Sequence, residues 1–304
     1  MKPLIPYFEP FSIPLPFDLP IVGHRDIYGF GILVAMGFIF GARMSQNKAE
    51  RDGQDPELIN RLVGWLVLGV FVGGHLGHAI MYDPQYFWEN PKELLSVWSG
   101  LSSFGGFVGC GAVTYWFFKR EDKLIRKANR KRKKAGEPLQ PRISILGYFD
   151  TLFYGFTLGW FFGRMGCFSA HDHPGLPTEF WLGVPGMCDI ARPDIACHDL
   201  GLYEAIWALA MVGAVMILDK KPRFPGFFSG FFILSYVPVR FVLDMFRDPF
   251  GDARYFGLTP AQYGSVVALF IGIAIIKKNI GRTPIRPIAN VGNADPTEKV
   301  GDEG

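Results

Sequence analysis

Long apolar stretches separated by strongly charged connectors constrain this chain more than any other feature. Seven windows have the roughly 17–25 apolar residues needed to cross a hydrocarbon core about 30 Å thick. The third and fourth are separated by KREDKLIRKANRKRKKAGEPLQPR, which no bilayer interior would accept. The pattern predicts an all-α polytopic membrane protein rather than a soluble protein with buried helices. The windows are 27–44, 60–82, 101–118, 144–168, 201–218, 225–247 and 260–276.

Lysine and arginine are concentrated in alternate connectors. One set of connectors holds 22 Lys and Arg residues, and the set that alternates with it holds 5. Since cytoplasmic connectors carry the excess of Lys and Arg, we predict that the N-terminus lies outside and the C-terminus in the cytoplasm. The rich set is 43–61, 119–142, 219–223 and 277–286; the poor set is 1–26, 83–100, 169–200 and 248–259.

The chain divides into three predicted parts. Residues 1–26 contain six prolines and no basic n-region, so we expect an extracytoplasmic interfacial segment and no cleavable signal peptide. Residues 27–280 form the membrane domain, with a basic cytoplasmic loop at 119–142 and an outer loop at 169–200. The polar residues 281–304 are predicted to be a disordered cytoplasmic tail. The basic loop has no interleaved aromatic residues, so membrane lipids, and no nucleic acid, are its expected partner.

Several ionisable residues fall inside the apolar windows, where each costs about 3 kcal/mol unless it is paired or lies in a wet cavity. Arg240, Asp244 and Arg247 are four and three residues apart, so Asp244 can bridge both guanidinium groups. Arg164 and Glu204 lie in other windows. Two interpretations stay open: ion pairs that join helices, or arginines that converge on an outward-opening anion site. A phospholipid phosphate suits such a site, because guanidinium binds phosphate oxygens bidentately.

Motifs in chain order resemble those of bacterial prolipoprotein diacylglyceryl transferases. GRMGCFSAHDHPG, at 163–175, resembles the family signature G-R-x-G-N-F-x-N-x-E-x-x-G. HDLGLYEA resembles H-P-x-Q-L-Y-E, and RFVLDMFRDP resembles R-x-x-x-E-x-x-R. Weaker similarities are found in YGFGILVAMGF, GGHLGHAIMY, FGGFVG and LTPAQYGS.

The resemblance implies a transferase that needs no cofactor and no metal. It would move the sn-1,2-diacylglyceryl group of phosphatidylglycerol onto the lipobox Cys thiol of a preprolipoprotein, in the bacterial inner membrane, with the active site toward the outer leaflet. Arg164 and Arg240 are the expected catalytic residues that stabilise the leaving phosphate. The expected substrate-binding residues are Tyr28, Arg164, Asp172, Gly175, Tyr203, Glu204, Asp244, Arg247 and Gln262. For Gln262, a merely interfacial role is equally open.

Departures from the family pattern concern the general base. Phe104 replaces the usual His or Tyr, while Cys167 and Ala170 replace two Asn residues. We hypothesise that an imidazole accepts the thiol proton, either His171 or His173 in the signature or His75 or His78. The alternative for the signature pair is an exposed turn. These departures leave open a family paralogue with another acceptor or none. An anion transporter would require internal symmetry, which the sequence lacks.

The outer loop contains Cys188 and Cys197. In an oxidising compartment their separation allows a disulfide, so we expect one. The rival interpretation is a metal site made by these thiols with His171, His173 and His198, whose spacing matches no standard pattern.

Overall fold

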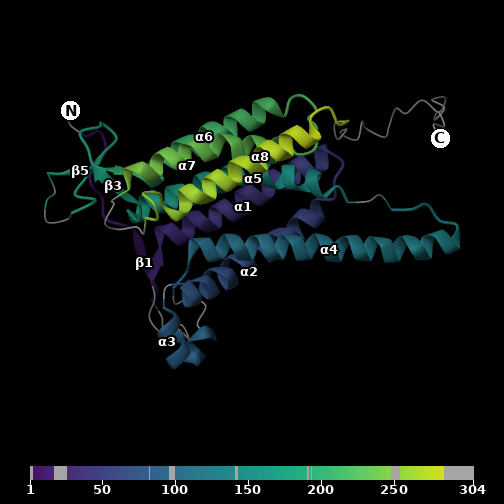
Figure 1. Ribbon diagram of the computed structural model, residues 1–304, viewed down its shortest axis with the longest axis horizontal. Coiled ribbons are helices and arrows are strands. Elements are labelled where there is room, and N and C mark those ends of the chain that lie inside the picture. The colour runs from purple at the N-terminus through teal and green to yellow at the C-terminus, as the bar shows by residue number, and fades with distance from the viewer. Residues whose placement is uncertain are drawn as a thin grey trace.

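The helices of the computed structural model follow the apolar windows (Figure 1). The structure describes residues 3–16, 26–81, 83–95, 100–140, 143–189, 192, 194–247 and 254–283, without the side chains of residues 103, 104 and 260. The predicted tail from 284 onward and part of the predicted interfacial segment lie outside these ranges. Within them the long helices are α1 (Gly29–Arg51), α2 (Pro56–Met81), α4 (Ser103–Ala135), α5 (Ile145–Ala170), α6 (Leu200–Leu218), α7 (Phe227–Leu243) and α8 (Pro260–Asn279).

Five of these helices are long and apolar enough to cross a membrane: α1, α2, α6, α7 with its extension to Phe246, and α8. The fold is therefore mostly helical, as predicted. Short helical turns complete it: α3 (Pro84–Glu89), η1 (Pro91–Leu95) and η2 (Asp244–Phe246).

Most of the predicted basic loop 119–142 is helical, because α4 continues to Ala135. Lys, Arg, Glu and Ala favour helix in water, and an ion pair of 2.7 Å between Arg126 and Asp122 supports one turn. The helix ends where Gly136 adopts a left-handed conformation with φ of 71°. The resulting extension projects past the other helices (Figure 1).

The end of the molecule that carries the N-terminus also carries two small antiparallel sheets, which the all-α prediction did not include (Figure 1). Strand β1 (Ser12–Pro14) pairs with β2 (Asp26–Tyr28). In the predicted outer loop, β5 (Ala196–Asp199) lies between β3 (Pro174–Pro177) and β4 (Val184–Pro185). The described part of the N-terminal segment is extended, as its prolines predict.

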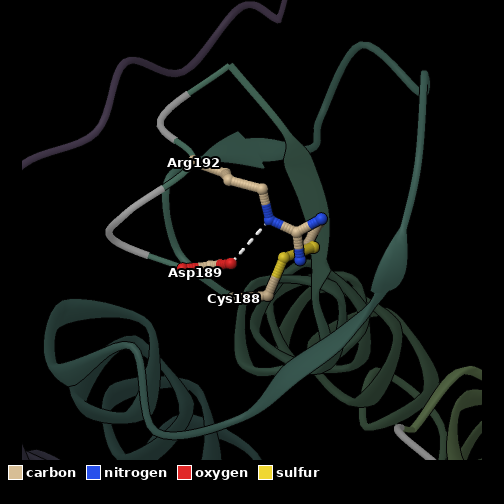
Figure 2. The surroundings of a disulfide bond; sticks show 4 residues. Cys188, Asp189 and Arg192 are labelled. Atoms are coloured by element: carbon tan, nitrogen blue, oxygen red, sulfur yellow. Dashed lines mark hydrogen bonds and ion pairs between the residues drawn. A yellow bond between two sulfur atoms is a disulfide. The ribbon is translucent and has the colours of Figure 1, made fainter.

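A disulfide between Cys188 and Cys197 closes part of the outer loop (Figure 2), so this prediction is confirmed. Beside it, Arg192 Nε lies 2.6 Å from a carboxylate oxygen of Asp189. The rival metal site is wrong as stated, because both of its thiols are used in the disulfide.

Glycines allow the helices to pack in close pairs, α1 along α5 and α2 along α4. A Cβ on Gly105 would lie 2.3 Å from the carbonyl oxygen of Gly73 and 2.8 Å from the Cα of Gly77. On the other pair, a Cβ on Gly155 would lie 2.2 Å from the carbonyl oxygen of Gly41. Small residues thus bring the backbones into contact, as in membrane helix pairs. Helix α6 packs on α5, and α8 on α7.

Candidate functional site

Arg164 of α5 and Arg240 of α7 meet on a single carboxylate, that of Glu204 near the start of α6. Arg164 Nε lies 3.0 Å from Glu204 Oε2, and Arg240 Nη1 lies 2.8 Å from Oε1. The Glu204 side chain is fully buried, whereas the two arginine side chains keep 13% and 15% of their surface exposed. The convergence of guanidinium groups from separate helices, expected from the sequence, is present in the structure. The carboxylate holds both groups in place from the protein side.

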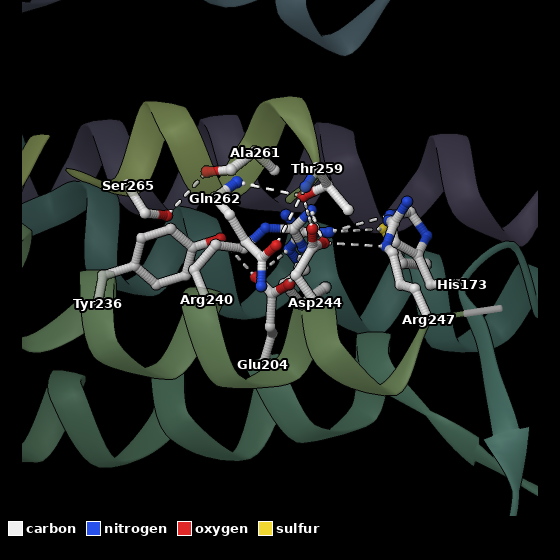
Figure 3. A network of polar contacts seen from close by, with 12 residues as sticks. His173, Glu204, Tyr236, Arg240, Asp244, Arg247, Thr259, Ala261, Gln262 and Ser265 are labelled. Atoms are coloured by element: carbon white, nitrogen blue, oxygen red, sulfur yellow. Dashed lines mark hydrogen bonds and ion pairs between the residues drawn. The ribbon is translucent and has the colours of Figure 1, made fainter. Parts of the chain in front are cut away.

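Asp244 bridges the two arginines of its own segment, as the spacing predicts. Its Oδ1 lies 3.1 Å from Arg240 Nη2 and 3.3 Å from Arg247 Nε (Figure 3). Its other oxygen accepts a hydrogen bond from the Thr259 hydroxyl at the start of α8. The buried Asp244 carboxylate therefore connects the start of α8 to Arg240 and orients Arg240 together with Glu204.

The arginines form the accessible side of the cluster. In the described part of the chain, three guanidinium groups contact the two buried carboxylates of Glu204 and Asp244. The arginines, not the carboxylates, carry the exposed surface of the cluster, so an anion would meet guanidinium first.

Two aromatic side chains complete the cluster and were not singled out from the sequence. Tyr236 donates its hydroxyl proton to Glu204 Oε2 over 2.6 Å (Figure 3). The Trp160 ring lies under the Arg164 guanidinium, 4.3 Å from centroid to Cζ. Each precedes its arginine by four residues on the same helix face, so helical spacing offered a signal for both.

His173 is the histidine of the signature that reaches the arginines. Its Nε2 lies 3.4 Å from Arg164 Nη1, and its Nδ1 contacts the Asp172 carboxylate. Because an ionised carboxylate only accepts, this contact places a proton on Nδ1 and leaves the Nε2 lone pair toward Arg164. Cys167 lies in the same group, with its sulfur 3.7 Å from Arg164 Nη1.

His171 is used elsewhere. Its left-handed backbone, with φ of 51°, ends α5 and turns the side chain toward the N-terminal segment. One ring nitrogen lies 2.9 Å from the Phe8 carbonyl oxygen and the other 3.7 Å from the Asp199 carboxylate. The interaction with Asp199 raises the pKa of His171 above its ordinary value. These contacts connect the end of α5 to the N-terminal segment and to β5.

Three other predicted residues have structural contacts of their own, and a fourth is exposed. The Gln262 side chain completes a capping box at the start of α8 and donates to the Phe241 carbonyl oxygen over 3.2 Å. The Tyr203 hydroxyl lies 2.8 Å from His198 Nδ1. Gly175 pairs with Arg247 through the backbone, at a point where a Cβ would lie 2.9 Å from the Phe246 carbonyl oxygen. Tyr28 is 60% exposed at the start of α1.

Cys167, Asp172 and His173 offer donor atoms within 4.8 Å of one another, a separation that suits a soft metal ion. The Arg164 guanidinium, however, contacts both the sulfur and the His173 Nε2. The cationic position between these donors is thus taken by an arginine, and a metal would have to displace it.

Comparisons with known proteins show what the whole chain is similar to. A family model described as prolipoprotein diacylglyceryl transferase matches residues 16–277. A phosphatidylglycerol–prolipoprotein diacylglyceryl transferase of Solidesulfovibrio magneticus is 31% identical over 280 residues, covering 90% of this chain and 95% of the relative. Proteins of the same name from Roseobacter denitrificans and Chromohalobacter salexigens are 28% and 29% identical, covering 88% and 89% of this chain and 97% and 92% of the relatives.

Proposed function

The chain belongs to the prolipoprotein diacylglyceryl transferase family, and on that premise we propose the reaction that its site performs. The enzyme transfers the sn-1,2-diacylglyceryl group of phosphatidylglycerol to the lipobox cysteine of a preprolipoprotein, the first step of lipoprotein maturation. The cysteine sulfur forms a bond to the diacylglyceryl carbon as the bond from that carbon to the phosphate oxygen breaks. Glycerol 1-phosphate leaves with the bonding electrons, and the thiol proton passes to a base.

We further propose that the protein spans the inner membrane seven times. In addition to the five apolar helices, α5 and the first half of α4 supply the remaining two spans. The basic connectors support an N-terminus outside and a C-terminus in the cytoplasm. In this orientation the arginine cluster and the small sheets face the outer leaflet, where preprolipoprotein signal sequences arrive.

The observation that carries the proposal is the meeting of Arg164 and Arg240 on Glu204. In the transition state, charge develops on the phosphate of the leaving glycerol phosphate. Guanidinium groups that are already oriented stabilise this charge without reorganising. Glu204, Asp244 and Tyr236 orient the arginines from behind, so their remaining N–H groups serve the phosphate.

For the base we propose His173 and not His171. Asp172 holds the proton on Nδ1, so Nε2 is the acceptor. When a phosphate takes the Arg164 N–H groups, this nitrogen becomes available to the lipobox thiol. Such a base is needed, because only a small fraction of a thiol with a pKa of about 8.5 is ionised at pH 7. Tyr28, Asp172 and Gly175 would line the path of the lipid headgroup.

The test is transfer of labelled diacylglyceryl from phosphatidylglycerol to a lipobox peptide by purified enzyme. Arg164→Ala and Arg240→Ala should each lower kcat by about 100-fold or more, the range for loss of one oxyanion donor. His173→Gln should also lower kcat, because no other side chain would accept the thiol proton at that place. His171→Gln is the matched control and should retain most activity. Full activity of His173→Gln would rule out this base.

The same enzyme in a cell decides between the transferase and a paralogue with another acceptor. It should complement a strain depleted of its own diacylglyceryl transferase. Phosphatidylglycerol binding without transfer to any lipobox peptide, together with failed complementation, would favour the paralogue.

A further inference from the structure

A polar cavity lies at the other end of α6 from Glu204. Its volume is about 130 Å³, and it opens between the ends of α1 and α6 and the starts of α5 and α7. Its lining includes Lys48, Asp219, Lys220, Lys221 and Arg223. Nothing in the proposed transfer reaction uses this cavity.

The inner wall of the cavity holds three carboxylates and two cationic side chains that contact them or lie beside them. The buried Lys48 ammonium lies 3.0 Å from the Asp52 carboxylate and 2.5 Å from that of Asp219. Arg51 also pairs with Asp219, at 2.5 Å. Asp150, the third carboxylate of the wall, accepts hydrogen bonds of 2.7 and 2.9 Å from the backbone N–H groups of Gly226 and Ser229. These contacts join the helices, and each carboxylate has its partners within the protein.

The mouth of the cavity carries three cationic side chains. Lys220 and Lys221 are exposed there, and in the described part of the chain neither forms an ion pair with a carboxylate. Arg223 donates from Nε to the Leu218 carbonyl oxygen over 2.9 Å and lies over the Phe227 ring, 4.7 Å from its centroid. These contacts use its inner edge and leave its charge uncompensated. Three cations thus surround the opening.

We propose that this cavity binds a phosphate group. Lys220, Lys221 and Arg223 supply charge-assisted donors around the opening. The volume of about 130 Å³ is enough for one phosphate group. Two sources share this chemistry: the headgroup of an anionic phospholipid in the cytoplasmic leaflet, and soluble phosphate. The connectors of this end carry the basic excess, so both sources reach the cavity from the cytoplasm in the proposed orientation.

The test measures hydrogen exchange of the backbone amides between residues 219 and 224, where Pro222 has no amide hydrogen, so that anions bound at the arginine cluster do not contribute. In one arm, inorganic phosphate is added to the detergent-solubilised protein against chloride of equal ionic strength. In the other, the protein is in nanodiscs of phosphatidylcholine with or without phosphatidic acid. At ten times Kd, a bound phosphate should slow exchange about tenfold.

The variant Lys220→Gln/Lys221→Gln removes two cations from the mouth and none from the buried wall. Its affinity for the probe should fall about fivefold per lysine, from the strength of one basic residue near an anionic surface. Lys127→Gln/Lys131→Gln, with the same charge loss on the exposed extension of α4, is the control and should behave like the wild type.

Protection in both arms supports a phosphate site open to either source. Protection in the nanodisc arm alone makes it a lipid headgroup site, and protection by inorganic phosphate alone makes it a soluble phosphate site. No protection in either arm, or equal protection in the two double variants, would overturn the proposal. Diacylglyceryl transfer activity does not enter the measurement, so either result leaves the proposed reaction untouched.

Discussion

Replacing Glu204 by Gln tests whether one buried carboxylate organises the arginine cluster. The change keeps the shape but removes the charge that Arg164 and Arg240 share, at 3.0 and 2.8 Å. The amide NH₂ then faces N–H donors, and Tyr236 loses its charged acceptor. Loss of one partner from a buried ionic group costs about 3–5 kcal/mol. With an unfolding entropy of about 2.1 cal/mol/K per residue over 304 residues, thermal unfolding in detergent should shift down by about 5–8 °C.

Glu137→Gln is the matched control, because it makes the same chemical change in an exposed ion pair. Glu137 lies 4.0 Å from Arg132, and their side chains are 58% and 36% exposed. Such pairs contribute about 0–1 kcal/mol, so the unfolding midpoint should move by less than about 2 °C. Equal shifts in the two variants would refute the view that Glu204 is the centre of the site.

The kinetics of Glu204→Gln follow from the same geometry. The change removes one negative charge beside Arg164 and Arg240, so the KM for phosphatidylglycerol should not increase. Turnover should fall about 100-fold, because arginines released from their carboxylate no longer meet the developing phosphate charge at the right place. The labelled-lipid transfer assay separates the two parameters. An increased KM with unchanged kcat would mean that Glu204 contacts the lipid instead of positioning arginines.

Three further predictions concern the scaffold. Asp199 raises the pKa of His171. The pair therefore contributes its full stabilisation of the folded state below a pH of about 6.5, and this stabilisation is lost as the pH rises through the folded pKa. His171→Gln should lower the unfolding midpoint more at pH 5.5 than at pH 9. Gly105→Ala should cost about 1–3 kcal/mol in thermal unfolding because the new Cβ meets backbone at 2.3 Å, whereas Gly111→Ala, with nothing within 4 Å, should be tolerated. Cys197→Ser should cost about 2–3 kcal/mol and speed proteolysis of the outer loop, and reductant should mimic it in the wild type.

The positions of the helices were predictable because apolar length is a local property. The windows at 201–218 and 260–276 match α6 and α8 within a few residues. The end of α4 was not predictable in this way, since a search for apolar residues stops where the helix leaves the membrane. Beyond Phe118 the helix continues on Lys and Arg, whose helix propensity is independent of hydrophobicity. The small sheet of the outer loop depends on pairing between segments that no local pattern links.

In the candidate site too, contacts within one segment were predictable from the sequence, and contacts between helices were not. Asp244 as a bridge between Arg240 and Arg247 follows from helical spacing within one segment. The role of Glu204 does not, because it depends on how α5, α6 and α7 approach one another. The choice between two neighbouring histidines was equally inaccessible. A single left-handed residue at the end of α5 sends His171 and His173 in different directions.

We expect that His173 supplies here the base that position 104 supplies in the family pattern. The family pattern has His or Tyr where this chain has Phe104, which cannot accept a proton. The chain offers in exchange an imidazole held by Asp172 beside Arg164. If the two positions are alternative sources of a base, Phe104→His should restore lipid transfer to an enzyme inactivated by His173→Gln. The same Phe104→His change should leave an Arg164→Ala enzyme inactive, because a base does not replace a phosphate-binding group. Rescue in neither background would mean that His173 orients Arg164 and that the thiol proton leaves by another route.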